Sequence, residues 1–307
     1  MALSASMVKE LREKSGAGMM DCKKALIETD GKLEDAVDWL RKQGLSAVAK
    51  KSSRVAAEGL IGITIKDNSG AIIEINSETD FVARNELFQN FVKTCSELVL
   101  SSKNDIDALQ NLPFPNANRS VNEELINNIA TIGENMNIRR TEYLEVSKGV
   151  LISYVHNSVA EGLGRLGVLV ALETGVQNND IKEIGKQIAM HIAATSPKSL
   201  NIEDLDPDVV ERERQVLIDQ AMSSGKPKEI AEKMVQGRMH KFFQEVVLNE
   251  QVSVIDGETK IKDLIKRTSL ELKTEIKIKG FKVLKLGEGV QIEESDFAAE
   301  VAATAGL

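Results

Sequence analysis

The sequence is poor in aromatic residues and in cysteine, and each shortage excludes a class of protein. Aromatic residues make up 4% of the 307 residues, with a single tryptophan at Trp39. Proteins that bind single-stranded nucleic acids stack the bases on aromatic side chains, so no stacking platform is expected here. The two cysteines, Cys22 and Cys95, belong to no Cys-x-x-Cys pair. Neither a disulfide framework nor a zinc site is therefore predicted.

Positive charge is also in short supply. The chain has 39 lysines and arginines against 47 aspartates and glutamates, which gives a formal net charge of -8. Affinity for nucleic acids rests largely on Lys and Arg side chains that neutralise phosphates. We therefore expect no direct nucleic-acid partner, and a protein or a small ligand remains as the binding partner.

Long hydrophobic runs are missing too. No stretch approaches the ~20 apolar residues that a membrane-spanning helix needs. The first residues lack the basic region and the apolar run of a signal peptide. The expectation is a cytoplasmic protein without a membrane partner.

Motifs for catalysis are scarce. The three histidines, His156, His191 and His240, lie far apart and show no metal-ligand spacing. Residues 162–167 match the G-x-G-x-x-G string of dinucleotide-binding proteins, but a strand-like apolar run follows them where that motif requires a helix. We interpret this segment as a tight connection between strands. The protein is expected to be no enzyme and to have no catalytic residue, metal or cofactor.

The N-terminal part shows three short helical patterns, over residues 7–14, 19–29 and 32–43. In the third, Leu33, Ala36, Val37 and Leu40 follow the spacing of a buried helical face, and Gly44 is placed to end the helix. The polar, basic residues 49–54 come next. We therefore predict a three-helix domain over residues 1–54.

The next part, residues 55–148, is predicted to be the first half of an α/β core. Isoleucine-rich strands over residues 60–66 and 71–76 flank a turn at residues 67–70, as in a β-hairpin. After residues 77–82, helices are expected at the positions of two apolar patterns. The first comprises Leu87, Phe88, Phe91, Val92, Cys95, Leu98 and Val99, and the second covers residues 121–134.

A similar order returns in the second half of the core. Strands are expected over residues 150–156 and 165–173, a helix over 180–194, and further strands around 275–286. This second subdomain comprises residues 149–200 and 249–287. The predicted class is α+β, with antiparallel sheets in two core subdomains.

Residues 201–248 interrupt the second subdomain with two long, charged helical segments. They form an antiparallel hairpin, and Pro227 suits the first turn of its second helix. A narrow apolar stripe consists of Val209, Val216, Ile230 and Met234. Such a hairpin projects from the body or pairs with a second copy in a homodimer. Residues 288–307 are expected to form a C-terminal module, with a helix from Ser295.

The 77–82 loop, which comprises residues 77–82, has two interpretations. In the first, Thr79 or Asp80 caps the following helix and Phe81 folds inward. In the second, Phe81 is an exposed anchor beside an acidic residue and enters a pocket on a partner. Local chemistry alone favours the cap, and both hold if Asp80 caps while Phe81 points outward.

Several long motifs together resemble the bacterial elongation factor Ts family, whose members are nucleotide exchange factors for elongation factor Tu. These motifs are residues 16–26 (GAGMMDCKKAL), 76–85 (NSETDFVARN), 190–194 (MHIAA), 224–235 (SGKPKEIAEKMV) and 296–301 (DFAAEV). They occur in the family's order and cover nearly the whole chain. The resemblance reverses the order of the two interpretations of the 77–82 loop.

The resemblance implies a fold and a set of contacts with elongation factor Tu. It implies a ubiquitin-associated-like N-terminal domain, a two-subdomain core, a dimerisation hairpin and a C-terminal module. In the 77–82 loop, Asp80 and Phe81 match the family's intrusive pair, which wedges into the GTPase domain of the partner. Further contacts are implied at Thr79, Val82, His156, Met19, Met20, Lys23, Lys51, Met234 and Val235.

Two other functions stay open at this point. The first alternative is a ubiquitin-associated-type adaptor without exchange activity, which would bind through its N-terminal domain alone. The second is an enzyme that uses the glycine-rich residues 162–167 to bind a dinucleotide.

Overall fold

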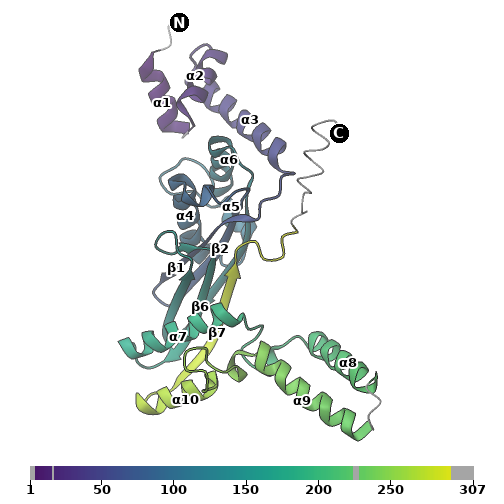
Figure 1. Ribbon diagram of the computed structural model, residues 1–307. Coiled ribbons are helices and arrows are strands. Elements are labelled where there is room, and N and C mark those ends of the chain that lie inside the picture. Colours follow the sequence, from purple (N-terminus) through teal and green to yellow (C-terminus); the bar gives the residue numbers. More distant parts are fainter. Residues whose placement is uncertain (1–3, 16, 224–227, 292–307) are drawn as a thin grey trace.

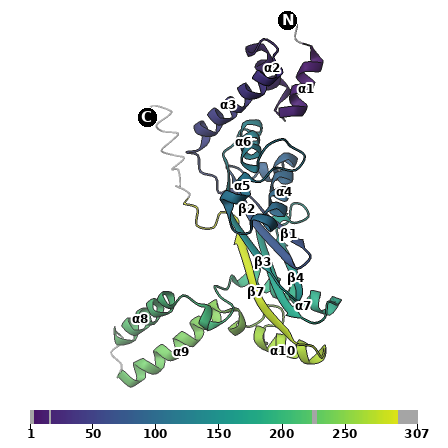
Figure 2. The ribbon, with the colours of Figure 1, turned by 180° about the vertical axis from the view of Figure 1, so that it is seen from behind.

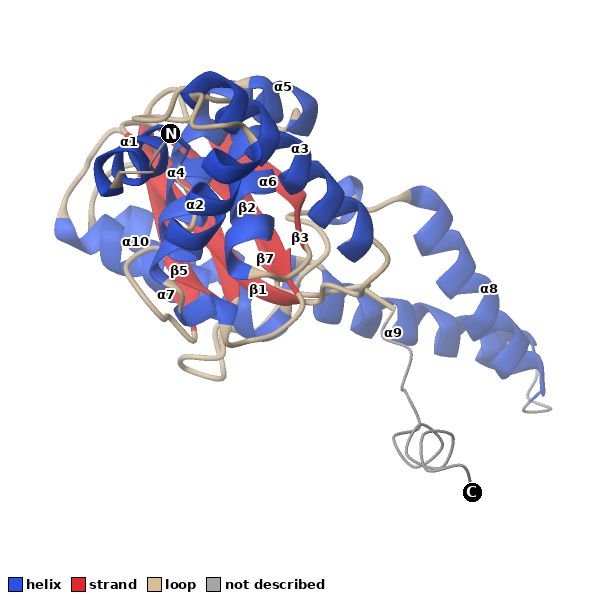
Figure 3. Ribbon diagram, turned by 90° about the horizontal axis from the view of Figure 1, so that it is seen from above, coloured by secondary structure: helices blue, strands red, loops and turns tan. Residues whose placement is uncertain are grey.

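The computed structural model describes residues 4–15, 17–223 and 228–291 and shows an elongated molecule with three parts (Figure 1). A helical module lies at the N-terminal end, two β-sheets form the core, and a pair of helices projects near the opposite end. Seen from above, the strands occupy the centre of the core and helices surround them (Figure 3). The predicted α+β class is confirmed.

Three helices form the N-terminal module, as predicted. They are α1 (Ala5–Ser15), α2 (Met19–Glu28) and α3 (Leu33–Lys51). Their apolar faces meet in a cluster of their own, in which Leu11, Cys22 and Leu26 are fully buried. The regular spacing places the apolar residues of each short helix on one face, and burial of these faces against one another holds the three helices together.

The expected end of the third helix at Gly44 is wrong, because α3 continues through the basic stretch to Lys51. Gly44 is buried, and a Cβ atom there would lie 3.0 Å from Cγ2 of Ile126 on α6 (Val121–Ile132). Arg41 of α3 also forms an ion pair of 2.7 Å with Glu123 of α6. Packing of α3 on α6 therefore keeps Gly44 helical, although glycine by itself favours a helix end. The domain boundary at residue 54 stays a prediction.

A four-stranded antiparallel sheet forms the first half of the core. Its order is β3-β2-β1-β5, with β1 (Glu58–Lys66), β2 (Ser69–Ser77), β3 (Met136–Glu145) and β5 (Leu163–Gly164). The predicted hairpin is confirmed: Ile63 lies opposite Ile72, and Asp67 adopts a φ of 52° in the turn. Strand β3 is absent from the sequence-based prediction. Its sequence is mostly polar, and Arg139 and Arg140 interrupt the apolar alternation.

Three helices cover one face of this sheet, namely α4 (Glu86–Ser102), α5 (Ile106–Asn111) and α6. The helix predicted from this apolar pattern is confirmed as α4, in which Phe88 and Phe91 are buried and Leu87 is 53% exposed. Helix α6 ends two residues before the predicted end, because Gly133 adopts a left-handed φ of 93°. This leaves Gly133, Glu134 and Asn135 between α6 and β3.

A three-stranded antiparallel sheet forms the second half of the core. Its order is β4-β6-β7, with β4 (Gly149–His156), β6 (Leu166–Thr174) and β7 (Ile276–Lys285). Helices α7 (Asn179–Thr195) and α10 (Ile261–Glu271) pack on its outer face. The predicted strands and the predicted helix of this half are confirmed. The strands expected around residues 275–286 are one strand, β7.

The two sheets pack face to face, so the core has helices outside and sheets inside. Ile61 and Ile72 of the first sheet meet Leu169 of the second, and all three are fully buried. Each such side chain stabilises the fold by about 2 kcal/mol. A Cβ atom at Gly167 would lie 2.6 Å from Cδ1 of Ile63 and 2.8 Å from Cγ2 of Ile61, so a larger residue there would force side chains between the sheets to shift. From behind, β7 and β3 lie along the same side of the core (Figure 2).

The interpretation of residues 162–167 as a tight strand connection is confirmed. These residues lead from β5 into β6, and the backbone N–H of Ile63 on β1 donates to the carbonyl oxygen of Gly162 at 2.8 Å. A Cβ atom at Gly164 would lie 2.8 Å from the carbonyl oxygen of His156. The glycines therefore allow backbones to approach one another and do not begin a helix.

The helical hairpin projects from the core, as predicted, and consists of α8 (Pro207–Ser223) and α9 (Lys228–Val246). Two residues of the apolar stripe, Val216 and Ile230, are 44% and 48% exposed on the hairpin. The buried seam lies next to that stripe and is formed by Leu217, Ala221, Ala231, Val235 and Met239. The small alanines let the two helices approach. The expected places of Pro227 and of the helix from Ser295 lie outside the described residues.

None of the helices that the structure describes combines the length and the apolar character needed to cross a membrane.

A buried histidine fixes the base of the hairpin. His191 of α7 is fully buried, and its Nε2 lies 2.9 Å from Oε1 of Gln251. The backbone N–H of Val254 donates to Nδ1 of His191 at 3.2 Å, so His191 is neutral and carries its proton on Nε2. Gln251 in turn donates through Nε2 to the carbonyl oxygen of Glu245 on α9 at 2.7 Å. This network joins α7 to the end of the hairpin.

Protonation of His191 is predicted to destabilise the fold. Burial lowers the pKa of His191 below its ordinary value of 6.5 in the folded protein. Between the folded pKa and 6.5, His191 binds up to one more proton in the unfolded chain than in the folded protein. Each unit by which the pH is lowered in this range therefore reduces the free energy of unfolding by up to about 1.4 kcal/mol. The contribution is complete above pH 6.5 and is lost as the pH falls towards the folded pKa.

Urea unfolding between about pH 7.5 and about pH 5 measures how the free energy of unfolding depends on pH in the wild type, in His191→Asn and in the exposed control His240→Asn. We expect the wild type and the control to lose stability in parallel, and His191→Asn to lose less over the same range. Equal pH dependence in all three proteins would contradict the prediction.

Candidate functional site

The 77–82 loop, which joins β2 to α4, is the candidate site. Its apex carries Phe81, whose side chain is 77% exposed, and the neighbouring Asp80 is also exposed. Among the large hydrophobic residues that the structure describes, Phe81 has the largest exposed fraction. Burial of this ring against a partner would contribute about 2 kcal/mol. Of the two interpretations, inward folding of Phe81 is wrong and exposure of Phe81 is confirmed.

The residues directly after Phe81 are anchored in the core. Val82 and Ala83 are 4% and 7% exposed and pack in the cluster beneath α4. The backbone turns in a short 3-10 helix, η1 (Val82–Arg84), in which Arg84 donates its N–H to the carbonyl oxygen of Phe81 at 3.1 Å. Gln89 of α4 adds a side-chain bond of 2.8 Å to the carbonyl oxygen of Ala83. Packing thus fixes the loop on one side of its apex.

The expectation that Thr79 or Asp80 caps the following helix is wrong. The N-cap of α4 is Asn85, whose Oδ1 accepts from the backbone N–H groups of Leu87 at 2.9 Å and Phe88 at 3.4 Å. The short helix η1 separates Asp80 from α4, which places both Thr79 and Asp80 too early in the chain to cap it. Their polar groups are therefore available for other contacts.

Two residues that follow α6 hold the start of the loop. The Glu134 carboxylate accepts the backbone N–H of Thr79 at 2.9 Å and the Thr79 hydroxyl at 2.6 Å. In the opposite direction, the carboxylate of Glu78 accepts the backbone N–H of Asn135 at 2.5 Å. Hydrogen bonds to charged acceptors are the stronger class. They tie the loop to the start of β3.

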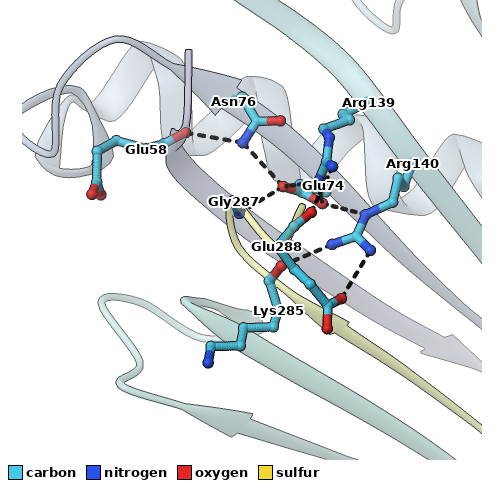
Figure 4. A network of polar contacts seen from close by, with 8 residues as sticks. All are labelled: Glu58, Glu74, Asn76, Arg139, Arg140, Lys285, Gly287 and Glu288. Atoms are coloured by element: carbon cyan, nitrogen blue, oxygen red, sulfur yellow. Dashed lines mark hydrogen bonds and ion pairs between the residues drawn. The ribbon is translucent and has the colours of Figure 1, made fainter. Parts of the chain in front are cut away.

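A buried carboxylate lies at the root of the loop (Figure 4). Glu74 of β2 is fully buried and forms ion pairs with Arg139 at 3.0 Å and with Arg140 at 2.5 Å, both on β3. Its Oε1 also accepts from Nδ2 of Asn76 at 3.0 Å and from the backbone N–H of Gly287 at 2.9 Å. A buried charge is tolerated only when it is paired and hydrogen-bonded in this way.

The same two arginines hold the chain that follows β7. Arg139 donates to the carbonyl oxygen of Glu288 at 2.6 Å, and Arg140 donates to the carbonyl oxygen of Lys285 at 2.8 Å. Arg140 also pairs with the Glu288 carboxylate at 3.1 Å. Segments far apart in the sequence therefore meet behind the candidate site.

Arg165 lies beside His156, one of the predicted site residues. Its guanidinium contacts the Glu58 carboxylate at 2.6 Å and 3.2 Å, and its backbone N–H donates to the carbonyl oxygen of His156 at 3.2 Å. The Glu58 hydrogen bond raises the pKa of Arg165 against the effect of burial, and the charges of Glu58 and Asp80 add to the rise. His156 thus lies beside Arg165, whose partner Glu58 is paired with Ser77 at the start of the 77–82 loop.

The other predicted contact residues occupy two different parts of the molecule (Figure 1). Met19 and Met20 are 59% and 72% exposed at the start of α2, with the exposed Lys23 one turn further on. Lys51, at the end of α3, is half-buried. In the hairpin, Met234 is half-buried and Val235 is buried in the seam. The structure does not bring these groups together with the 77–82 loop.

Comparisons with known proteins show the family of the chain. A model of the family described as Elongation factor TS matches residues 78–288. Elongation factor Ts of Rhodospirillum centenum is 56% identical over 304 residues, which cover 99% of each chain. The proteins of the same name in Rhodospirillum rubrum and Zymomonas mobilis are 53% and 52% identical, over 98% and 99% of each chain. The chain belongs to the elongation factor Ts family.

Membership of the elongation factor Ts family makes the chain a translation elongation factor. The candidate site offers an exposed ring beside an exposed carboxylate, which suits contact with another protein. No group of three or more His, Cys, Asp or Glu residues able to hold a metal ion occurs within residues 4–15, 17–223 and 228–291.

The residues that hold the loop, Glu74, Glu134 and Asn135, were not singled out from the sequence. A signal for two of them was present. Gly133 is a strong helix-end residue, which places Glu134 and Asn135 in the connection after α6. The alternation of Met136 and Ile138, both buried, then indicates a strand. For Glu74 the sequence contains no comparable signal, because its partners come from distant segments.

Removal of the Glu74 side chain is predicted to destabilise the protein. In Glu74→Ala, Arg139 and Arg140 lose the carboxylate that balances their charge, and we expect the free energy of unfolding to fall by about 3 kcal/mol. The matched control is Glu97→Ala, at an exposed position of α4. Urea unfolding measures both variants. A loss in Glu74→Ala no larger than that in the control would contradict the prediction.

Proposed function

We propose that the chain binds elongation factor Tu in its GDP-bound form and promotes release of GDP by inserting the 77–82 loop into the GTPase domain. The single observation that carries the proposal is the exposed Phe81, which is held on an anchored loop in a member of the elongation factor Ts family. GTP then reloads the emptied partner in the cytoplasm.

Exchange of this kind requires no chemistry on the part of the exchange factor. The exchange factor binds the nucleotide-free partner more tightly than the GDP-bound partner. By thermodynamic linkage it therefore lowers the partner's affinity for GDP by the same factor. What the exchange factor must supply is binding energy at a surface that competes with the nucleotide.

Phe81 and Asp80 have different roles in the proposal. Phe81 enters an apolar space in the partner and supplies the energy of insertion. Among the described residues, no hydrogen-bond donor engages the Asp80 carboxylate, so it is available to compete for hydrogen bonds near the phosphate and Mg²⁺ region of the partner. Thr79 and Val82 hold these two residues from either side.

The remaining contacts serve to bind the partner over a wider surface. We assign them to His156 in the core, to Met19, Met20, Lys23 and Lys51 in the N-terminal module, and to Met234 in the hairpin. Val235 supports Met234 from inside the seam. Pairing of two copies through the hairpin stays a prediction.

Phe81→Ala is predicted to lower the rate of GDP release about thirtyfold, because a central aromatic anchor carries about 2 kcal/mol of binding free energy. The measurement follows fluorescent GDP released from elongation factor Tu at increasing concentrations of the full-length protein. Leu270→Ala is a matched control, since Leu270 of α10 is 72% exposed but lies outside the proposed contacts. If Phe81→Ala released GDP as fast as the control, the loop would not be the wedge.

Asp80→Asn is predicted to lower the maximal rate of GDP release by about tenfold, because the amide keeps the shape of the side chain but loses its charge. Release is compared with that of Glu258→Gln, which removes a charge from an exposed residue distant from the loop. An unchanged maximal rate in Asp80→Asn would show that the charge has no part in displacing the nucleotide.

A further inference from the structure

We infer that Glu134 and Asn135 are positioning residues for nucleotide exchange, which hold the 77–82 loop in the shape in which Phe81 enters the partner. The inference rests on the proposed function and adds to it two residues that touch neither the partner nor the nucleotide. They act through Thr79 and Glu78.

The contacts between the two pairs of residues are reciprocal. Glu134 receives both hydrogen-bond donors of Thr79, the backbone N–H at 2.9 Å and the hydroxyl at 2.6 Å. Glu78 receives the backbone N–H of Asn135 at 2.5 Å. Each of these three bonds has a carboxylate as acceptor, and Thr79 lies only two residues before Phe81.

A third element reinforces the same pair. The Asn135 side chain donates through Nδ2 to the carbonyl oxygen of Arg54 at 2.8 Å, and the Arg54 guanidinium lies 3.4 Å from the Glu78 carboxylate. Asn135 is 8% exposed, so it is fixed in the core while Glu78 and Thr79 are half-buried. The start of the loop is thus attached to a fixed point.

The two sides of the loop are held by different means. After Phe81, Val82 and Ala83 are buried and packing fixes the backbone. Before Phe81, Asp80 is exposed and little apolar surface is buried. On this side the bonds from Glu134 and Asn135 take the place of packing.

The bonds that hold Thr79 and Glu78 matter for exchange because they order the 77–82 loop before the partner binds. A backbone residue that must become ordered on binding costs about 1–2 kcal/mol. If Thr79 and Asp80 were free to adopt other conformations, that cost would fall on the insertion step and would reduce the energy available to displace GDP. Glu134 and Asn135 meet this cost when the protein folds, before the partner arrives.

The geometry of α6 supports the same role. Gly133 ends α6 in a left-handed conformation, with a φ of 93°, and β3 begins at Met136. Gly133, Glu134 and Asn135 are therefore the whole connection between the helix and the strand. The connection is short and both of its ends are held, so its two side chains have fixed positions relative to the loop.

The test measures GDP release from elongation factor Tu as a function of the concentration of the full-length protein. Glu134→Ala is expected to lower the maximal rate about tenfold, and Thr79→Val, which removes only the hydroxyl bond, about threefold. Thr79→Ser restores that bond and is expected to recover most of the rate. The half-saturating concentration should change by less than about twofold, because the first encounter uses other contacts. Glu97→Ala is the control.

If Glu134 and Thr79 served only the stability of the fold, their variants would give a different result. A variant that is partly unfolded has fewer active molecules, so its half-saturating concentration rises while its maximal rate stays the same. A second comparison uses the Phe81→Ala background. There, Glu134→Ala should lower the rate less than about twofold further, because the ring that Glu134 positions is already gone.

Three results would overturn the inference. The first is an unchanged maximal rate in both Glu134→Ala and Thr79→Val, and the second is a rise in the half-saturating concentration of these variants with no change in their maximal rate. The third is an equal effect of Glu134→Ala on the maximal rate in the wild-type protein and in the Phe81→Ala background. Each of these results is compared with the wild-type protein, which must itself accelerate GDP release in the same assay. A wild type that failed to accelerate release would instead refute the proposed function, so the two failures are distinguishable.

Discussion

The need to pair one buried charge organises the part of the molecule around the candidate site. Glu74 is fully buried, and a carboxylate in that position is tolerated only if donors surround it. Arg139 and Arg140 supply charge from β3, and Gly287 supplies a backbone donor from the segment after β7. Strand β2, strand β3 and the chain after β7 are therefore joined at one point, from which the 77–82 loop begins three residues later.

That loop exposes an aromatic ring and yet is held at both ends, as the proposed insertion into the partner requires. Packing secures Val82 and Ala83 behind the apex, and two carboxylates secure Glu78 and Thr79 in front of it. The face-to-face sheets then bring His156 to the same end of the core. A member of the elongation factor Ts family can act through such a surface because exchange depends on differential binding and not on bond making.

Local patterns predicted those elements whose apolar residues repeat at a regular spacing. The three N-terminal helices, the isoleucine hairpin of β1 and β2, and α7 were found in this way. The errors arose where a distant contact overrides the local signal. Gly44 stays helical because α6 packs on it. Strand β3 was missed because its sequence is mostly polar and Arg139 and Arg140 interrupt its apolar alternation.

The sequence by itself determined the class of the fold, the family and the identity of the exposed pair Asp80 and Phe81, because these depend on spacing and on contiguous motifs. Only the tertiary structure decided how that pair is held. Glu134, the partner of Thr79, and Asn135, the partner of Glu78 after α6, lie 55 and 57 residues away along the chain, so no local pattern contains them. Hydrogen bonds and ion pairs depend on distances in space, and those distances exist only once the strands and helices have packed.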